Sequence, residues 1–291
     1  MKIIIFGGGI SGLTTAHILV QKGFQVELYE SEPIIGGMAR RRREPLTEIP
    51  TEHSWRGYAP FYRNFYHIAQ QIPTQGGKTV IDNLADHVKF FMLNNDEQQS
   101  KFDIKSELIV AYVIGKTILS DKRSQKDYQK AIAPMLKKHI SKASYDFIIK
   151  FLMGPGWGMD KDTASLKHYA KFTELSLFHS QGPDGKQQNF WKVMKGPTQE
   201  MWFQPWQKFL EEKGVIFHLN CSLKYINIRN NEIYNCILSD GTQIIGDNYI
   251  FAINPFNLEN ILSQSPTIPK SLTQKHSNSN NKSDYEMIAF F

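Results

Sequence analysis

Glycines near the start of the chain have the spacing of a turn that binds phosphate groups. They are Gly7, Gly9 and Gly12, with Ile10 and Ser11 between the last two. An apolar strand (3–6) precedes the turn and a helical apolar pattern (13–20) follows it. In such a turn Gly7 permits the tight bend, Gly9 lets the backbone approach a pyrophosphate, and Gly12 lets the helix pack on the strand. The free N–H groups at the helix N-terminus also attract phosphates.

A carboxylate stands where this kind of turn meets a ribose. Glu30 follows a second apolar strand (26–29) and lies about 20 residues beyond the glycines, the usual separation. At that position a carboxylate accepts hydrogen bonds from both ribose hydroxyls and repels a 2′-phosphate, which disfavours NADP. The segment therefore predicts a Rossmann-like dinucleotide-binding unit. A glycine-rich turn without a ligand is the alternative.

A second glycine pair follows closely. It forms the run Gly36, Gly37, Met38, Ala39 and Arg40. This order and spacing resembles the second signature of FAD-dependent amine oxidases, phytoene desaturases and protoporphyrinogen oxidases. The resemblance implies FAD as cofactor, with the glycine amides near it and Arg40 against its diphosphate. The three further arginines (41–43) are interpreted as solvated or substrate-side charges, because four residues make a weak case for a nucleic-acid patch.

Residues 50–64 loosely fit a third segment of the same family, in which the chain passes the flavin ring. The matching positions are Glu52, Gly57, Tyr62 and Asn64, and His53 replaces a small residue. Glu52 and His53 are therefore expected to lie at the cofactor. The alternative is a half-buried loop whose histidine is satisfied by other protein groups.

Near its end the chain resembles the returning half of that FAD domain. A helical run (201–210) leads to strand-like segments at 215–219, 223–228, 232–238 and 247–255, and the turn at Asp240-Gly241 is a hairpin signal. By resemblance, the backbone of Leu223 meets the adenine and Ala252 lies near the adenosine.

The family implies the α/β class: a Rossmann-like FAD-binding domain (GR2-type) with an inserted, largely helical substrate domain. We expect the FAD-binding domain to comprise residues 1–65 and 191–262 and the insert residues 66–190. Residues 263–291 are expected to be a flexible segment and the start of a strand. Helical periodicity at 128–140, with Ser124 as N-cap, and at 145–152 supports a helical insert.

The resemblance also implies a reaction. An FAD-dependent oxidoreductase of this kind accepts a hydride at flavin N5 from an amine or an apolar polyene C–H bond, and no catalytic residue can be named. The alternatives are a non-catalytic remnant, an adenine-dinucleotide-binding module, or a flavin-dependent mutase or isomerase. The family's C-terminal block, with its third glycine motif, has no counterpart after Ala252. We therefore expect a truncated amine-oxidase-like protein, poorly active alone, and a complementing C-terminal polypeptide.

Composition limits the partners. A net charge of +6 over 291 residues is too dispersed for a nucleic-acid surface, although it is compatible with peripheral contact with an anionic membrane. The histidines form no zinc motif, and Cys221 and Cys236 lack metal-ligand spacing, so no metal is expected. The first strand begins at Lys2, which leaves no room for a signal peptide. Since no apolar run reaches about 18 residues, we expect a cytoplasmic protein.

Overall fold

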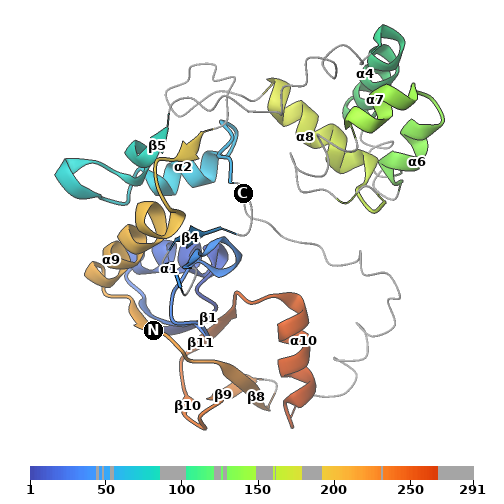
Figure 1. The fold of residues 1–291 in the computed structure, drawn as a ribbon. Coiled ribbons are helices and arrows are strands. Elements are labelled where there is room, and N and C mark those ends of the chain that lie inside the picture. The colour runs from blue at the N-terminus through green and yellow to red at the C-terminus, as the bar shows by residue number, and fades with distance from the viewer. Residues whose placement is uncertain are drawn as a thin grey trace. The chain divides into compact units, whose positions relative to one another are not determined.

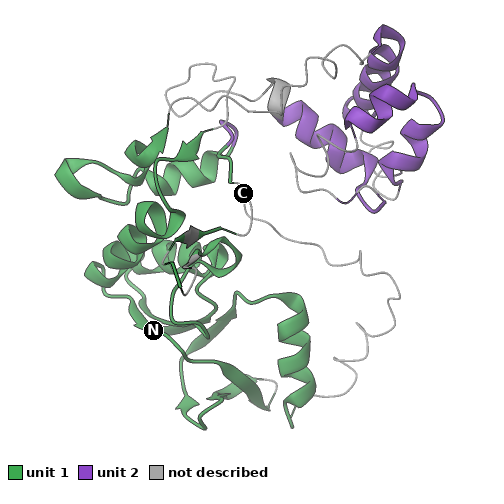
Figure 2. Ribbon diagram, in the orientation of Figure 1, with its two compact units in different colours: residues 1–58, 62–86, 192–291 green, residues 59–61, 87–191 purple. Residues whose placement is uncertain are grey.

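The computed structural model describes residues 1–43, 46–47, 49–52, 56–85, 103–120, 126, 130–148, 160, 162–178, 192–230 and 232–267. The chain forms two compact units, coloured separately in Figure 2. Unit 1 comprises Met1–Tyr58, Tyr62–Asp86 and Lys192–Phe291, and unit 2 comprises Ala59–Phe61 and His87–Trp191.

Unit 1 is built on a parallel sheet of four strands. The strands are β1 (Lys2–Phe6), β2 (Gln25–Tyr29), β7 (Ile216–His218) and β11 (Asn248–Phe251), in the order β11-β1-β2-β7. Helix α1 (Ile10–Gln21) connects β1 to β2, and Gly23, which follows its C-cap Lys22, has a φ of +83° that favours glycine. This is the expected Rossmann-like α/β fold. Its outer strands come from distant parts of the chain.

Both faces of this sheet are covered, so apolar residues of its strands are buried on both sides. On one face, Ile3, Ile5, Val26 and Leu28 pack in a core with α1 and α9 (Gln204–Glu212). The other face contributes Ile4, Phe6 and Tyr29 to a second core with an antiparallel meander. Its strands are β8 (Leu223–Arg229), β9 (Glu232–Leu238) and β10 (Gln243–Ile244), and Figure 1 shows α10 (Pro255–Gln264) beside them.

The helix expected before β7 is divided in two. A single π-helical turn, η5 (Gln199–Phe203), leads directly into α9. Pro205 has no N–H and so cannot donate to the carbonyl of Met201, its partner in a regular helix. Asn83 donates its side-chain amide to that carbonyl at 2.7 Å instead. The irregular turn is thus stabilised from a remote segment.

Unit 1 continues through residue 86, beyond the boundary expected at residue 65. This part contains α2 (Arg63–Ala69), the 3₁₀ turns η2 (Gln75–Gly77) and η3 (Val80–Asn83), and β5 (Leu84–Ala85), which pairs with β6 (Val193–Met194). Its apolar residues share the first core with Trp202 and Phe203. A short ribbon of β3 (Arg42–Arg43) and β4 (Pro50–Thr51) completes the unit's named elements.

The described part of unit 2 is helical, as expected for the insert. Its helices are α4 (Ile104–Ile118), α6 (Ile132–Lys137), α7 (Lys142–Phe147) and α8 (Leu166–Phe178). The predicted helix at 128–140 is shorter in the structure, because the Ile132 N–H donates to the carbonyl of Ala164 and the Lys130 carbonyl accepts the N–H of Leu166, at the start of α8. Ser124, residues 149–152 and residues 268–291 lie outside the described residues.

Asp103 joins two helices of unit 2. It caps α4 by accepting the N–H of Ser106 at 2.9 Å, and it also accepts the hydroxyls of Ser106, Ser141 and Ser144. These hydrogen bonds hold the pKa of Asp103 well below its usual range. Since Ser141 is the N-cap of α7, one carboxylate fastens the N-terminal ends of both helices.

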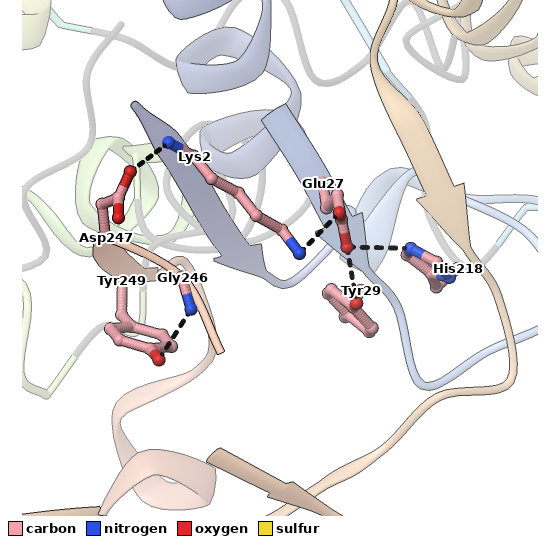
Figure 3. A network of polar contacts seen from close by, with 7 residues as sticks. All are labelled: Lys2, Glu27, Tyr29, His218, Gly246, Asp247 and Tyr249. Atoms are coloured by element: carbon pink, nitrogen blue, oxygen red, sulfur yellow. Dashed lines mark hydrogen bonds and ion pairs between the residues drawn. The ribbon is translucent and has the colours of Figure 1, made fainter. Parts of the chain in front are cut away.

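A polar chain crosses the parallel sheet of unit 1 (Figure 3). Asp247 accepts the backbone N–H of Lys2 at 2.7 Å, and the Lys2 ammonium pairs with Glu27 at 2.8 Å. Glu27 also accepts the Tyr29 hydroxyl at 2.8 Å and lies 3.3 Å from His218 Nε2. Burial alone would raise the pKa of Glu27, but the bonds from Lys2 and Tyr29 outweigh it and the pKa is lowered. All four strands, or the residues flanking them, are thereby linked.

Candidate dinucleotide-binding site

The first glycine turn is possible only with glycine at two positions. Gly7 has a φ of +110°, and a Cβ there would lie 2.3 Å from the carbonyl oxygen of Ala252. A Cβ on Gly12 would lie 1.9 Å from the carbonyl oxygen of Gly7. Gly9 is the N-cap of α1 and supplies no capping side chain, and the first turn contains no acidic residue. The N–H groups of that turn are thus left for an anion.

The second glycine turn packs against the first. Gly36 and Gly37 both have positive φ, +119° and +56°, and begin the 3₁₀ turn η1 (Gly37–Ala39). The Gly36 N–H donates to the carbonyl of Gly8 at 2.8 Å, and a Cβ on Gly37 would lie 2.8 Å from the Cα of Gly9. The Met38 side chain points to solvent, with 82% of it exposed. The two turns therefore form one continuous backbone surface.

Glu30 organises the edge of this surface. Its side chain is buried and accepts the N–H of Gly8 at 2.6 Å, while its other oxygen accepts the N–H of Glu32 at 2.9 Å and the Ser31 hydroxyl at 3.0 Å. Gly8 is a residue that spacing alone missed, since it occupies a variable position of the motif. The sequence signal that could have indicated Gly8 is its place within three consecutive glycines. In the structure, a Cβ at this position would lie 3.0 Å from the Glu30 carboxylate.

Arg40 lies at the end of the second turn. Its guanidinium donates to the carbonyl of Gly37 at 3.2 Å and pairs with Glu32 at 2.9 Å. Glu32 is a second residue that the sequence did not single out. Its backbone contacts Glu30 and its carboxylate contacts Arg40, so it connects the two parts of the site.

The two residues predicted from the returning half of the domain lie at the same edge. Ala252 donates its N–H to the carbonyl of Phe6 at 2.8 Å and backs the first turn. Leu223 is buried at the start of β8, two residues after Cys221, whose N–H donates to the carbonyl of Glu30 at 2.8 Å. The predicted residues brought together are Gly7, Gly9, Ile10, Ser11, Gly12, Glu30, Gly36, Gly37, Met38, Ala39, Arg40, Leu223 and Ala252.

Glu52 has protein partners of its own. It pairs with Arg56 and accepts the N–H of Thr198 at 2.9 Å, and Arg56 also reaches the hydroxyl of Thr198 at 3.2 Å and the carbonyl of Met38 at 3.5 Å. This cluster connects the loop before η5 to the second glycine turn. His53 lies outside the described residues.

The interpretation of Arg41 as a solvated charge is wrong. Arg41 is buried, with 4% of it exposed, and its guanidinium pairs with Glu200 on η5. A buried guanidinium requires such a partner, and the partner lies far along the chain. The side chains of the next two arginines are not among those described.

Two further features concern the described parts of the chain alone. No group of three or more His, Cys, Asp or Glu side chains there could hold a metal ion. No helix there combines the length and the apolar character that crossing a membrane requires.

Comparison with known proteins agrees with this geometry. Residues 5–72 match the family model described as an NAD(P)-binding Rossmann-like domain. The carotenoid phi-ring synthase of Streptomyces griseus is 36% identical over 66 residues, which cover 23% of this chain and 13% of that protein. The zeta-carotene desaturase of Synechocystis sp. (strain PCC 6803) is 21% identical over 91% of this chain and 60% of its own length.

A solved structure shares the fold. Wild-type putrescine oxidase bound to putrescine aligns with a TM-score of 0.65 at 13% identity, over 95% of this chain and 63% of that chain. The chain spans about 60% of the length of the zeta-carotene desaturase that it matches. The glycine turns, the parallel sheet and these matches together support a relationship to the superfamily of FAD-dependent oxidoreductases that contains the amine oxidases and carotenoid desaturases.

Proposed function

We propose that this chain binds FAD at the two glycine turns and takes part in the oxidation of an apolar polyene or an amine. The observation that carries the proposal is that three structural features lie together: the uncapped N-terminus of α1, the backbone surface shared by Gly9 and Gly37, and the buried Glu30 carboxylate. These are the groups that a diphosphate and a ribose require. The names of the curated relatives concern carotenoids, which favours a polyene over an amine.

The residues fit the adenosine diphosphate half of such a cofactor. The first-turn N–H groups of α1 would bind the diphosphate, with Arg40 beside it, and Glu30 would accept a ribose hydroxyl. Glu30 already accepts three protein donors, so its orientation is set before a ligand arrives. When bound, FAD supplies the hydride-accepting ring, and the protein's part is to position and shield it.

A second candidate function rests on the same geometry. The site residues described above would contact the adenosine diphosphate half of a dinucleotide, so they support equally an adenine-dinucleotide-binding module without redox chemistry. The two functions differ in one observable: only the oxidoreductase has a bound flavin that is bleached by a polyene or an amine in the absence of oxygen.

The sharpest test of the binding site is Gly9→Ala. Gly9 has a φ of −78°, which any residue adopts, and the atom nearest to an added Cβ is the Cα of Gly37 at 3.6 Å. The fold should therefore tolerate the methyl group, while a diphosphate against the backbone should not. We expect ADP and FAD binding to be lost in calorimetry, with thermal unfolding unchanged.

Gly115→Ala is the matched control, since Gly115 lies on α4 in unit 2 and a Cβ there meets nothing within 4 Å. That variant should bind ADP as the wild type does. Undiminished ADP affinity in Gly9→Ala would refute the assignment. NADP should bind more weakly than the other dinucleotides, because Glu30 repels a 2′-phosphate.

A further inference from the structure

We propose that Glu32 limits the affinity of the site for the cofactor diphosphate by holding the guanidinium of Arg40 in an ion pair. The proposal rests on the proposed function, since it assumes that the diphosphate lies at the two glycine turns. It assigns a positioning role to a residue outside both glycine motifs.

The ion pair lies next to the phosphate-binding backbone. Arg40 Nη2 is 2.9 Å from Glu32 Oε1, and Arg40 Nη1 donates to the carbonyl of Gly37 at 3.2 Å. Gly37 in turn packs directly on Gly9, the N-cap of α1. The guanidinium is therefore fixed beside the surface that a diphosphate would occupy.

The position of Glu32 is set by its backbone. Its N–H donates to Glu30 Oε1 at 2.9 Å, and its carbonyl accepts the N–H of Asn220 at 3.2 Å. These bonds do not involve the Glu32 side chain. Replacing the carboxylate by an amide should thus leave the backbone and the orientation of Glu30 intact, and change the charge beside Arg40.

The charge of Glu32 opposes anion binding in two ways. A carboxylate at hydrogen-bond distance competes with the phosphates for the guanidinium, and its negative charge also repels the phosphates directly. The Glu32 side chain is 37% exposed and that of Arg40 19% exposed, so solvent screens the pair and a diphosphate can compete for the guanidinium. Removing the carboxylate should therefore strengthen diphosphate binding.

The test is a double-mutant cycle with ADP and adenosine as calorimetric probes, using Glu32→Gln, Arg40→Gln and the double variant. We expect Glu32→Gln to bind ADP about two- to fivefold more tightly than the wild type, the range for a partly exposed ion pair. Adenosine, which has no phosphate, should show no change. In the Arg40→Gln background the gain should be smaller, because only the direct repulsion between Glu32 and the phosphates is then removed.

Glu232→Gln removes the same charge from an exposed position on β9 and should leave ADP affinity unchanged. ADP affinity of Glu32→Gln at or below the wild-type value would overturn the proposal. So would a gain that persists undiminished in the Arg40→Gln background, because Arg40 would then be irrelevant. A wild-type chain that binds no ADP refutes the proposed function instead, so the two failures are distinguishable.

Discussion

Replacing Glu30 by Gln tests how much of the site depends on one carboxylate. Glutamine keeps the size of the side chain but has a single acceptor oxygen, whereas Glu30 accepts the N–H of Gly8 through one oxygen and that of Glu32 through the other. The amide NH₂ therefore has to face one of these backbone donors. That donor loses its partner in a site where Glu30 is only 6% exposed.

The loss can be estimated from the bonds involved. A buried hydrogen bond to a charged group contributes about 1.5–3 kcal/mol, so the variant should lose about that much folding stability. Losing the charged acceptor for the ribose should weaken ADP and FAD binding by about ten- to a hundredfold. Urea unfolding and calorimetry measure the two effects separately, and binding of flavin mononucleotide, which has no adenosine, should be unaffected.

Glu27→Gln is the matched control because Glu27 lies on β2, the strand that leads directly to Glu30. Its carboxylate binds Lys2 and Tyr29 on the opposite face of the sheet from α1, so the variant should lose stability and keep its ADP affinity. Equal losses of ADP and flavin mononucleotide binding in Glu30→Gln would refute the reasoning. An equal loss of ADP affinity in Glu30→Gln and Glu27→Gln would also refute the reasoning, because destabilisation of the whole sheet would then explain the weaker binding.

Three other predictions concern separate parts of the molecule. Gly37→Ala should abolish ADP binding, because its Cβ would lie 2.8 Å from the Cα of Gly9. The control is Gly77→Ala, at a residue with a similar positive φ and open space around it, which should lower stability and leave ADP affinity unchanged. Calorimetry measures the affinity and urea unfolding the stability. Burial lowers the pKa of His17 below its ordinary value of 6.5, so the unfolded chain binds a proton more readily. Stability should therefore be full above pH 6.5 and fall below it, and a His17→Gln variant should show a flatter dependence of the urea midpoint on pH. Asp103→Ala should reduce hydrogen-exchange protection at the starts of α4 and α7 without changing ADP affinity. A loss of protection confined to unit 1 would contradict this prediction.

The glycine turn and its flanking elements could be predicted because their signals are local. A strand, a turn with glycine at set positions, a helix and a second strand follow one another within residues 2–30, and the structure has each at the predicted place. The Asp240-Gly241 hairpin between β9 and β10 was readable for the same reason, since Gly241 has a φ of +90°. Such features depend on backbone conformation more than on distant partners.

Pairings between distant residues left no comparable signal. Arg41 could be read only as one of four consecutive arginines, because nothing near it indicates Glu200. Glu52 likewise depends on Thr198, and Glu32 matters through a carboxylate that contacts Arg40. Helix α4 was missed for a different reason: Leu108 and Tyr112 are exposed while Ile114 is buried, so apolar residues on both faces blur the helical period.

The polar chain across the parallel sheet has a consequence for the order of folding. Strands β1 and β2 can pair as soon as the first residues are synthesised, but Glu27 meets His218, and Lys2 meets Asp247, only after the whole of unit 2 has been made. The helices of unit 2 are joined by contacts such as those of Asp103 with Ser141 and Ser144, 38 and 41 residues apart, whereas the outer-strand contacts of His218 and Asp247 close loops of 191 and 245 residues. During synthesis unit 2 should therefore fold before the sheet of unit 1 is complete. The glycine turn exists from the beginning, yet Ala252, which backs it, arrives late. A nucleotide can thus stabilise only the finished sheet, and it should accelerate neither the helices of unit 2 nor the first β1–β2 pairing.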